Sequence, residues 1–422
     1  MVIRQVSTLN MGTKFKRTPI GDLPVDWEVV RLNDLLDLQG GYPFQSNNFQ
    51  DNGIPVVRIS NVKPKGIYLD NCVYIQKELL ENYKEYLLED GDALIAMSGA
   101  TTGKIGIVSK DVLPAVFNQR VGRFRIKNNA RISKGYLNQI ILTNNFKTQL
   151  LLNAAGGAQP NVSGNNIEKI EIALPSSHEQ NKITEILMSV DNALEKSSDV
   201  IKKTKQLKKG LMQQLLTRGI GHNKFKNSSI GKIPIEWDVS ILYDIAEIEM
   251  GQSPSSNDCN QEGVGIPFYQ GNADFGELHP KARYWCDKPK KIAKQGDILI
   301  SVRAPVGEIN IAPHESCIGR GLSAIRPKNI DKDYLFYAIA FYKTMLINIA
   351  QGSTFESVNG KELKNLNLPI PKREEQSQIA EILDSIDKSI ENEHAYKQVL
   401  EQLKSTLMQS LLTGKIRVTN NV

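Results

Sequence analysis

An internal duplication constrains the fold of this chain more than any other feature of its sequence. The segment IGDLPVDWEVVRLNDL at residues 20–35 recurs as IGKIPIEWDVSILYDI at residues 230–245, with Ile, Gly, Pro and Trp at matching positions. Further along, GDALIAMSG from Gly91 matches GDILISVRA from Gly296. Self-similarity in the same order along most of the 422 residues predicts two copies of one structural unit.

The closing segment of each copy predicts a long helix. Residues 179–217 and 375–413 align without a gap and share 18 of 39 residues. Neither segment contains a proline, and each follows one. The apolar residues recur at the three- and four-residue spacing of a helix with one apolar face, which needs a partner to cover it. We therefore expect an intramolecular coiled coil. Its predicted core is Ile183, Leu187, Val190, Leu194, Leu207, Leu211, Ile379, Leu383, Ile386, Leu403 and Leu407.

The rest of each copy is typical of a loop-rich globular domain. Short apolar runs such as DALIAM, KIGIVS and DILISV are separated by Gly, Pro and Asn, which predicts strands. The predicted fold class is α+β: two similar globular domains separated and joined by two long antiparallel helices that form a coiled coil, with an internal pseudo-two-fold repeat. The predicted boundaries are 1–175 for the first domain, 176–218 for the central helix, 219–371 for the second domain, 372–414 for the distal helix and 415–422 for the tail.

The composition favours an anionic partner. Lys and Arg number 52 against 46 Asp and Glu, which gives a net charge of +6. The N-terminal sequence lacks the apolar core of a signal peptide, and Lys343 interrupts the most apolar later stretch, so we expect a soluble cytoplasmic protein. The four cysteines lie far apart without a CxxC pair, which predicts packed, reduced thiols rather than a zinc site or a disulfide framework.

The motifs, in this order and found twice, resemble those of the specificity (S) subunit of type I restriction–modification enzymes. The resemblance rests on the IG…P…W opening, GDILIS, the YQGNADFG segment from Tyr269, and the LP…EQ…I…IL…D helix start followed by LM(Q)…LLT, and it covers nearly the whole chain. It implies that each globular unit is a target recognition domain reading one half of an asymmetric bipartite sequence in double-stranded DNA. It also implies that the helices set the spacing of the halves and dock two methyltransferase (modification) subunits. In complexes that cleave DNA, two restriction (motor-nuclease) subunits would join them.

Symmetry leads to a similar function without the resemblance. A homodimer of one DNA-reading domain meets the same half-site twice and requires a palindrome, whereas two diverged domains in one chain can read different halves. In this chain the framework positions of the two copies agree while the loops differ. This pattern is expected when the scaffold maintains geometry and the loops carry specificity.

A small polar loop at residues 98–106, SGATTGKIG, is the first candidate DNA contact. It is not a nucleotide-binding Walker loop, because only three residues separate Gly99 from Gly103 and Ile105 follows Lys104. The backbone amides and the lysine suit a DNA phosphate, but the same sequence also fits a tight turn between strands.

Alternating arginines mark a strand in the first copy. Arg120, Arg123 and Arg125 would share one face of that strand, and the second copy keeps Arg320 in the matching segment. Such a face either contacts DNA or is simply solvated.

Equivalent loop positions that carry different residues complete the predicted DNA-binding zones. Arg58 lies opposite Gln270 in the repeat, and Arg, Asn and Gln can form paired hydrogen bonds with base edges. Any one of these residues could equally be an ordinary surface side chain. The predicted zones are Arg58, Ser98, Thr101, Thr102, Lys104, Arg120, Gln159, Asn161, Gln270, Asn272, Arg283, Arg303, Arg320, Thr354 and Phe355.

A lysine cluster in the first helix has two interpretations. It comprises Lys202, Lys203, Lys205, Lys208 and Lys209, and the matching positions of the second helix are mostly not basic. The default interpretation is a solvated face. The alternative hypothesis is that the cluster lies above the non-specific DNA spacer between the two half-sites.

The sequence carries no recognisable catalytic motif. NPPY and DPPY methyltransferase motifs, a glycine-rich cofactor loop and a DEAD-type motor motif are absent, and the five histidines lack metal-ligand spacing. We predict a non-catalytic subunit with no catalytic residues, metal site or cofactor of its own. The resemblance implies that partner subunits bind S-adenosylmethionine, ATP and Mg, and that the chain directs adenine methylation and, with restriction subunits, cleavage.

Two other functions fit the repeat. The first is a nuclease acting alone, which magnesium-dependent DNA cleavage by the isolated chain would support. The second is a scaffold that grips two copies of another protein without contacting DNA. Steep salt dependence of DNA binding would separate that scaffold from a DNA reader.

Overall fold

The computed structural model describes residues 13–154, 162–351 and 357–418. The chain divides into two compact units. Unit 1 comprises residues 1–196 with 397–422, and unit 2 comprises residues 197–396. This division passes through both long helices, so each unit contains one globular domain and a segment of each helix, whereas the predicted boundaries treat the helices as separate parts. No helix in the described ranges is long and apolar enough to span a membrane.

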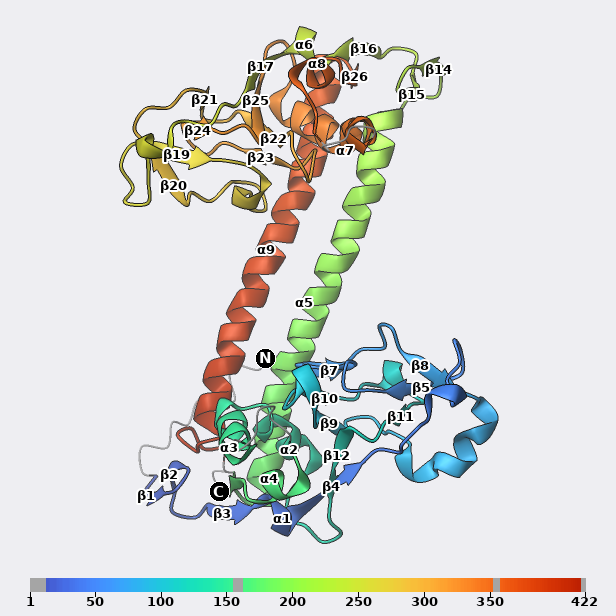
Figure 1. Cartoon of the computed structure of the whole chain (residues 1–422), viewed down its shortest axis with the longest axis vertical. Helices are drawn as coiled ribbons and strands as arrows, with labels where there is room; N and C mark the ends of the chain where they lie inside the picture. Colours follow the sequence, from blue (N-terminus) through green and yellow to red (C-terminus); the bar gives the residue numbers. More distant parts are fainter. Residues whose placement is uncertain (1–12, 155–161, 352–356, 419–422) are drawn as a thin grey trace. The chain divides into compact units, whose positions relative to one another are not determined.

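The globular part of unit 1 is built from short strands followed by three helices (Figure 1). In chain order the elements are β1 (Phe15–Thr18), β2 (Gly21–Pro24), β3 (Glu28–Arg31), α1 (Leu32–Leu35), β4 (Leu36–Gly40), the 3₁₀ helix η2 (Ser46–Asn48), β5 (Ile54–Val57), β6 (Val62–Lys63), β7 (Lys65–Ile67), β8 (Val73–Ile75), η3 (Lys77–Tyr86), β9 (Ala93–Ala96), η4 (Gly99–Thr101), β10 (Ile105–Ile107), η5 (Lys110–Val112), β11 (Val116–Phe117), β12 (Val121–Ile126), α2 (Lys134–Ile140), α3 (Asn144–Ala154), α4 (Gly164–Glu168) and β13 (Glu171–Leu174). The long helix α5 (Ser177–Arg218) follows.

Unit 2 repeats this plan. Its elements are β14 (Phe225–Ser228), β15 (Gly231–Pro234), β16 (Asp238–Ile241), α6 (Leu242–Ile245), β17 (Ala246–Met250), η6 (Ser256–Asp258), β18 (Cys259–Asn260), β19 (Ile266–Tyr269), η7 (Asn272–Asp274), β20 (Tyr284–Cys286), β21 (Ile292–Ala293), β22 (Ile298–Ser301), β23 (Ile309–Ile311), β24 (Ser316–Ile318), β25 (Leu322–Pro327), α7 (Lys332–Gln351), α8 (Gly360–Lys364) and β26 (Asn367–Ile370). The second long helix, α9 (Arg373–Leu411), closes the repeat.

Corresponding sheets confirm the α+β fold class and the duplication. The strand order β4-β12-β9-β10-β7-β6 in unit 1 corresponds to β17-β25-β22-β23 in unit 2, and β11-β5-β8 corresponds to the middle of β18-β20-β19-β24-β21. Two-stranded pairs complete each unit: β1-β2 and β13-β3 in unit 1, β14-β15 and β16-β26 in unit 2. The predicted strands DALIAM and DILISV form β9 and β22, every residue of which is buried. Their continuous apolar sequence is expected of strands covered on both faces.

The repeated tryptophan of each opening motif joins the domain to the start of a long helix. Trp27 is fully buried, and its indole nitrogen donates a hydrogen bond to Glu179 Oε2 at 3.0 Å. Trp237 donates to Glu375 Oε2 at 2.9 Å in unit 2. In unit 1, Arg417 also donates to Glu179, and this hydrogen bond raises the pKa of the arginine. The IG…P…W and EQ motifs therefore recur together because they contact one another.

The core series of both long helices follows heptad spacing. Steps of four and three residues alternate from Ile183 to Leu215 in α5 and from Ile379 to Leu411 in α9. Every residue reached by these steps is buried or half-buried. This is the spacing of a coiled-coil core. Nine of the eleven predicted core residues belong to the series and are buried or half-buried: Ile183, Leu187, Val190, Leu194, Leu211, Ile379, Leu383, Ile386 and Leu407.

The predictions that Leu207 and Leu403 lie in the coiled-coil core are wrong. Their side chains are 56% and 44% exposed. Leu207 follows Ile201 by six residues, and six residues turn a side chain about 120° away around a helix of 3.6 residues per turn. Lys208 and Lys404, one position later, take the two core places instead and are half-buried and buried.

Each core lysine pairs with an aspartate on the other long helix of the same unit. In unit 2, Lys208 Nζ lies 2.6 Å from both carboxylate oxygens of Asp387. In unit 1, Lys404 pairs with Asp191, and its side chain is only 7% exposed. The two pairs occupy equivalent positions in the repeat. Because Lys208 is bound in this way, it does not belong to the solvated lysine cluster, whose other four members are exposed.

The helix segments within each unit are antiparallel. In unit 1, Leu187 shares a core with Leu411, whereas Asp191, one turn later in α5, pairs with Lys404, which lies earlier in α9. In unit 2 the later part of α5 is likewise antiparallel to the first part of α9. The apolar residues of these two segments share one core, and Lys208 pairs with Asp387.

The corrected core register predicts different costs for two leucines on the same helix. Leu187→Ala should lower the free energy of unfolding by about 2–5 kcal/mol, because it empties a fully buried site. Leu207→Ala should change it by no more than about 0.5 kcal/mol, because that side chain is mostly in water. Urea unfolding of the full chain measures both values, and equal losses would contradict the register.

Candidate nucleic-acid interface

A groove of about 440 Å³ in unit 2 collects residues that are distant in sequence. Its lining comes from the loops after β17, β19, β22 and β24, which open at one place on the domain. Five of the predicted DNA-binding residues line it: Gln270, Asn272, Arg283, Arg303 and Arg320. The other lining residues are Ser253, Gly271, Ala273, Asp274, Ala304, Pro305 and Gly321.

Asp274 organises the loop that forms one wall of the groove. Its side chain is 2% exposed. The backbone amides of Gln270 and Gly271 donate to Oδ2 at 2.7 and 3.4 Å. Arg283 donates to Oδ1 from Nε at 2.8 Å and from Nη2 at 2.6 Å. The hydrogen bond to Asp274 raises the pKa of Arg283 above its usual value.

The groove is suited to an anionic ligand. Three arginines and one aspartate are the charged residues among its lining. Arg303 and Arg320 are exposed, and the backbone amide of Arg320 donates to Ser253 Oγ at 3.3 Å. A concave surface with excess positive charge attracts phosphates, and Arg, Asn and Gln side chains can also read base edges.

Unit 1 builds the corresponding loop with different residues. The amide of Arg58 donates to Asn61 Oδ1 at 3.0 Å, just as the amide of Gln270 donates to Asp274. Arg58 Nη2 donates to the carbonyl of Asn71 at 2.9 Å. The predicted equivalence of Arg58 and Gln270 in the repeat therefore agrees with their backbone geometry.

The small polar loop of unit 1 is a tight turn that uses several of its own amides. The amides of Thr102, Gly103 and Lys104 donate to carbonyls within the β9–β10 connection at 2.8–3.1 Å, so they are already paired. Lys104 remains exposed. The hydroxyls of Ser98 and Thr101 are buried and have no hydrogen-bond partner among the described residues. Lys104 is the charged side chain that this loop exposes, and the amides of residues 102–104 are not free for a phosphate.

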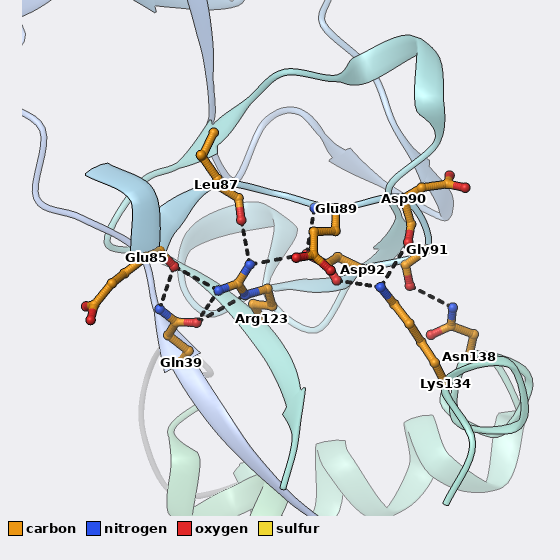
Figure 2. Close-up of polar contacts among 10 residues, drawn as sticks. All are labelled: Gln39, Glu85, Leu87, Glu89, Asp90, Gly91, Asp92, Arg123, Lys134 and Asn138. Atoms are coloured by element: carbon orange, nitrogen blue, oxygen red, sulfur yellow. Dashed lines mark hydrogen bonds and ion pairs between the residues drawn. The ribbon is translucent and has the colours of Figure 1, made fainter. Parts of the chain in front are cut away.

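The prediction that Arg120, Arg123 and Arg125 share one accessible face of a strand is wrong. Arg120 precedes β12 and lies three residues before Arg123, so alternation along a strand does not place these two side chains on one face. Arg123 shares a face with Arg125 but is largely withdrawn from solvent. Figure 2 shows its guanidinium in a polar cluster, where it donates to Asp92 Oδ2 at 3.2 Å and to Gln39 Oε1 at 2.6 Å. It also donates to the carbonyls of Leu87 and Glu85, and its side chain is 12% exposed. A guanidinium with five donors satisfies these buried acceptors, so Arg123 is structural. Arg120 and Arg125 are exposed.

The GD motif supplies the aspartate of this cluster in both copies. Asp92 also pairs with Lys134 at 2.8 Å (Figure 2), and Asp297 of unit 2 receives hydrogen bonds from Arg326 at 2.6 and 3.0 Å. The preceding Gly91 has φ 76°, a conformation that favours glycine. The motif thus marks a turn and a buried charge pair.

Arg320 lies in the segment that matches Arg120, but the two residues are offset by one position in the repeat. The carbonyl of Arg120 accepts a hydrogen bond from the residue after β9, and in unit 2 the carbonyl of Gly321 accepts the equivalent bond from the residue after β22. Arg320 therefore corresponds to Gln119. Matching by residue type misses this shift, which the backbone hydrogen bonds define. Four predicted positions lie outside the described residues: Gln159, Asn161, Thr354 and Phe355.

Three cysteines that are scattered in sequence come together in unit 2. Cys259, Cys286 and Cys317 lie on three strands of one sheet and pack in one apolar cluster with Phe268. Burial raises the pKa of Cys317 to about 12, so it is a thiol at neutral pH. In the described part of the chain, no group of His, Cys, Asp and Glu side chains is arranged to hold a metal ion.

A larger hollow in unit 1 lies away from the predicted DNA-binding residues. Its volume is about 780 Å³, and it lies between α2, α3 and the last turns of α9. Its lining includes apolar side chains such as Ile140, Phe146 and Met408. The groove of unit 2 is a better candidate for nucleic acid, because three arginines line it.

Comparisons with known proteins give one family. Residues 24–203 and 234–402 each match the family model described as the type I restriction modification DNA specificity domain. The type I restriction enzyme MjaX specificity subunit of Methanocaldococcus jannaschii is 35% identical over 414 residues, covering 96% of this chain and 97% of that protein.

Solved structures agree with this match. A chain from a structure of complex assembly and conformational transition in the type I R-M system has 26% identity and a TM-score of 0.59, covering 93% of this chain and 99% of that chain. The type I restriction-modification S subunit from M. genitalium has 14% identity and a TM-score of 0.61, covering 96% of this chain and 98% of that chain, which supports the fold.

Arg120 and Arg123 should respond differently to the same substitution. Arg120→Gln should reduce the slope of log affinity against log salt for DNA by about one and leave stability unchanged, because an exposed arginine can release a counterion from a phosphate. Arg123→Gln should leave that slope unchanged and cost about 1–3 kcal/mol of stability, because buried acceptors lose their donor. DNA binding between 50 and 200 mM salt, with urea unfolding, measures both. A changed salt slope for Arg123→Gln would show that its side chain does reach DNA.

Proposed function

Because the chain belongs to the family of type I restriction–modification DNA specificity subunits, we propose that its two units read the two halves of one asymmetric, bipartite sequence in double-stranded DNA. The observation that carries this proposal is a common framework with different loop residues. Equivalent turns present Arg58 in unit 1 and Gln270 in unit 2, and the turn of unit 2 is one residue longer. Different side chains on one scaffold are what two unlike half-sites require.

The long helices are proposed to set the spacing of the half-sites and to dock two methyltransferase subunits. Each helix continues without a break from one unit into the other. The heptad core and the two lysine–aspartate pairs hold the helix segments in one register within each unit. A spacer needs a fixed register, because it must hold the two DNA-reading units at one separation. If the separation of two half-sites along the DNA axis changes, the direction in which each half-site faces changes too.

The chemistry is assigned to partner subunits. In this proposal the methyltransferase subunits bind S-adenosylmethionine and methylate adenine, and restriction subunits, where they are part of the complex, use ATP and Mg to cleave DNA. The chain itself contributes sequence recognition in the cytoplasm, where the host DNA lies. The relatives are named as specificity subunits, which supports this division of labour.

The proposal predicts a single change in the methylated sequences of the host. Deleting this gene should abolish N6-methyladenine at one split motif, two short unlike halves with a fixed gap, and restoring the gene should restore that motif. Single-molecule sequencing of genomic DNA with the gene intact, deleted and restored measures this.

A second result would favour the protein scaffold instead. If no motif changes although the partner methyltransferase is present and active on other DNA, the chain does not select the target. Weak DNA binding that hardly depends on salt would agree with that outcome.

A further inference from the structure

The buried carboxylate of Asp274 has one charged partner among the described residues. That partner is Arg283, which donates to Oδ1 through two nitrogens. A carboxylate that is 2% exposed needs such a partner, because an unpaired buried charge is strongly destabilising. The arginine itself is 56% exposed, so only the edge of the guanidinium facing Asp274 is withdrawn from solvent.

Unit 1 shows that the loop itself does not require this charge. Asn61, fully buried, takes the place of Asp274 in a turn that is one residue shorter, and it accepts a hydrogen bond from the amide of Arg58, the counterpart of Gln270. Its amide group donates to the carbonyls of Tyr68 and Asp70. A neutral side chain therefore suffices to shape the turn. The negative charge of Asp274 is specific to the unit that carries Arg283.

The two units carry their arginine at different positions of the common scaffold. The strand pairing of β5 with β8 and of β19 with β20 makes Cys72 the counterpart of Arg283. In unit 1 the arginine comes instead from position 58, and its guanidinium donates to the carbonyl of Asn71, next to Cys72. In both units a nearby acceptor therefore holds an arginine at these two loops. The acceptor is the carbonyl of Asn71 for Arg58 and the carboxylate of Asp274 for Arg283.

The guanidinium of Arg283 is oriented, whereas those of its neighbours are not. Asp274 uses Nε and one hydrogen of Nη2, which leaves Nη1 and the second hydrogen of Nη2 as a free pair of donors. Among the described residues, Arg303 and Arg320 make no side-chain hydrogen bond or ion pair. All three line the groove. A fixed fork suits a base edge, while free cations suit phosphates.

We infer that Arg283, held by Asp274, reads a guanine in the half-site of unit 2 through O6 and N7, and that Arg303 and Arg320 bind the DNA backbone. This inference rests on the proposed function. Paired hydrogen bonds from arginine to guanine in the major groove give one position of the target its identity. Asp274 is a positioning residue in this arrangement, because it acts on the base only through Arg283.

The test uses the full chain assembled with its methyltransferase subunits. The wild-type complex first defines the methylated motif by single-molecule sequencing of treated DNA. Arg283→Lys keeps the charge but removes the fork, so it should relax one guanine position in one half, with discrimination there reduced about 5- to 150-fold. The other half of the motif should not change. Competition with oligonucleotides substituted at each position measures the discrimination directly.

Asp274→Asn provides a second variant that should fold, because Asn61 already serves this turn in unit 1. It should relax the same position while leaving the thermal unfolding midpoint within a few degrees of wild type. If Arg283→Lys fails to assemble, the motif methylated by the Asp274→Asn complex tests whether Arg283 reads a guanine. Arg303→Gln and Arg320→Gln are the matched controls, and each should weaken binding to all sequences alike without changing the motif.

The outcomes separate this inference from the proposed function. If the wild-type complex methylates no split motif, the proposed function fails. If it methylates a split motif that Arg283→Lys and Asp274→Asn leave unchanged, only the inference fails, and the pair serves stability alone. Relaxation at a base other than guanine, or uniform weakening across all sequences, would also overturn it.

Discussion

The hydrogen bond between a buried tryptophan and a glutamate at the start of a long helix connects the parts of each unit. Trp27 and Trp237 sit in the opening motifs, and their acceptors Glu179 and Glu375 begin the helices. A buried indole N–H needs an acceptor, and a buried carboxylate needs donors, so each group fixes the other. The contact therefore joins the opening segment of each domain to the first turn of its long helix.

Charged pairs inside the helix packing add register to that connection. Lys208 and Lys404 occupy core positions where apolar residues would pack without a preferred partner. A lysine in a heptad core is satisfied only when its aspartate lies opposite, and a polar core residue therefore specifies alignment. In unit 2, Tyr337 also donates to Asp387, and burial raises the pKa of this tyrosine, so its hydroxyl stays protonated.

The loops that line the proposed DNA-binding surfaces differ between the two units. The turn after β5 and the turn after β19 share a backbone hydrogen bond but carry Asn61 in one unit and Asp274 in the other. The buried network around Asp92 does not vary in kind, since Asp297 also binds an arginine. A rigid frame with satisfied buried charges allows surface residues to change without loss of the fold.

The duplication, the α+β class, the two long helices and most of their core can be predicted from the sequence, because they depend on residue order and periodicity. In the structure Leu207 and Leu403 are exposed. For Leu207 the spacing already implies this, because six residues after Ile201 bring a different face of the helix to the core. The tertiary structure also shows that the half-buried Arg123 lies in a polar cluster, while Arg283 is fixed by Asp274. Alternation along a strand does not reveal which acceptors lie nearby, because those come from residues distant in sequence.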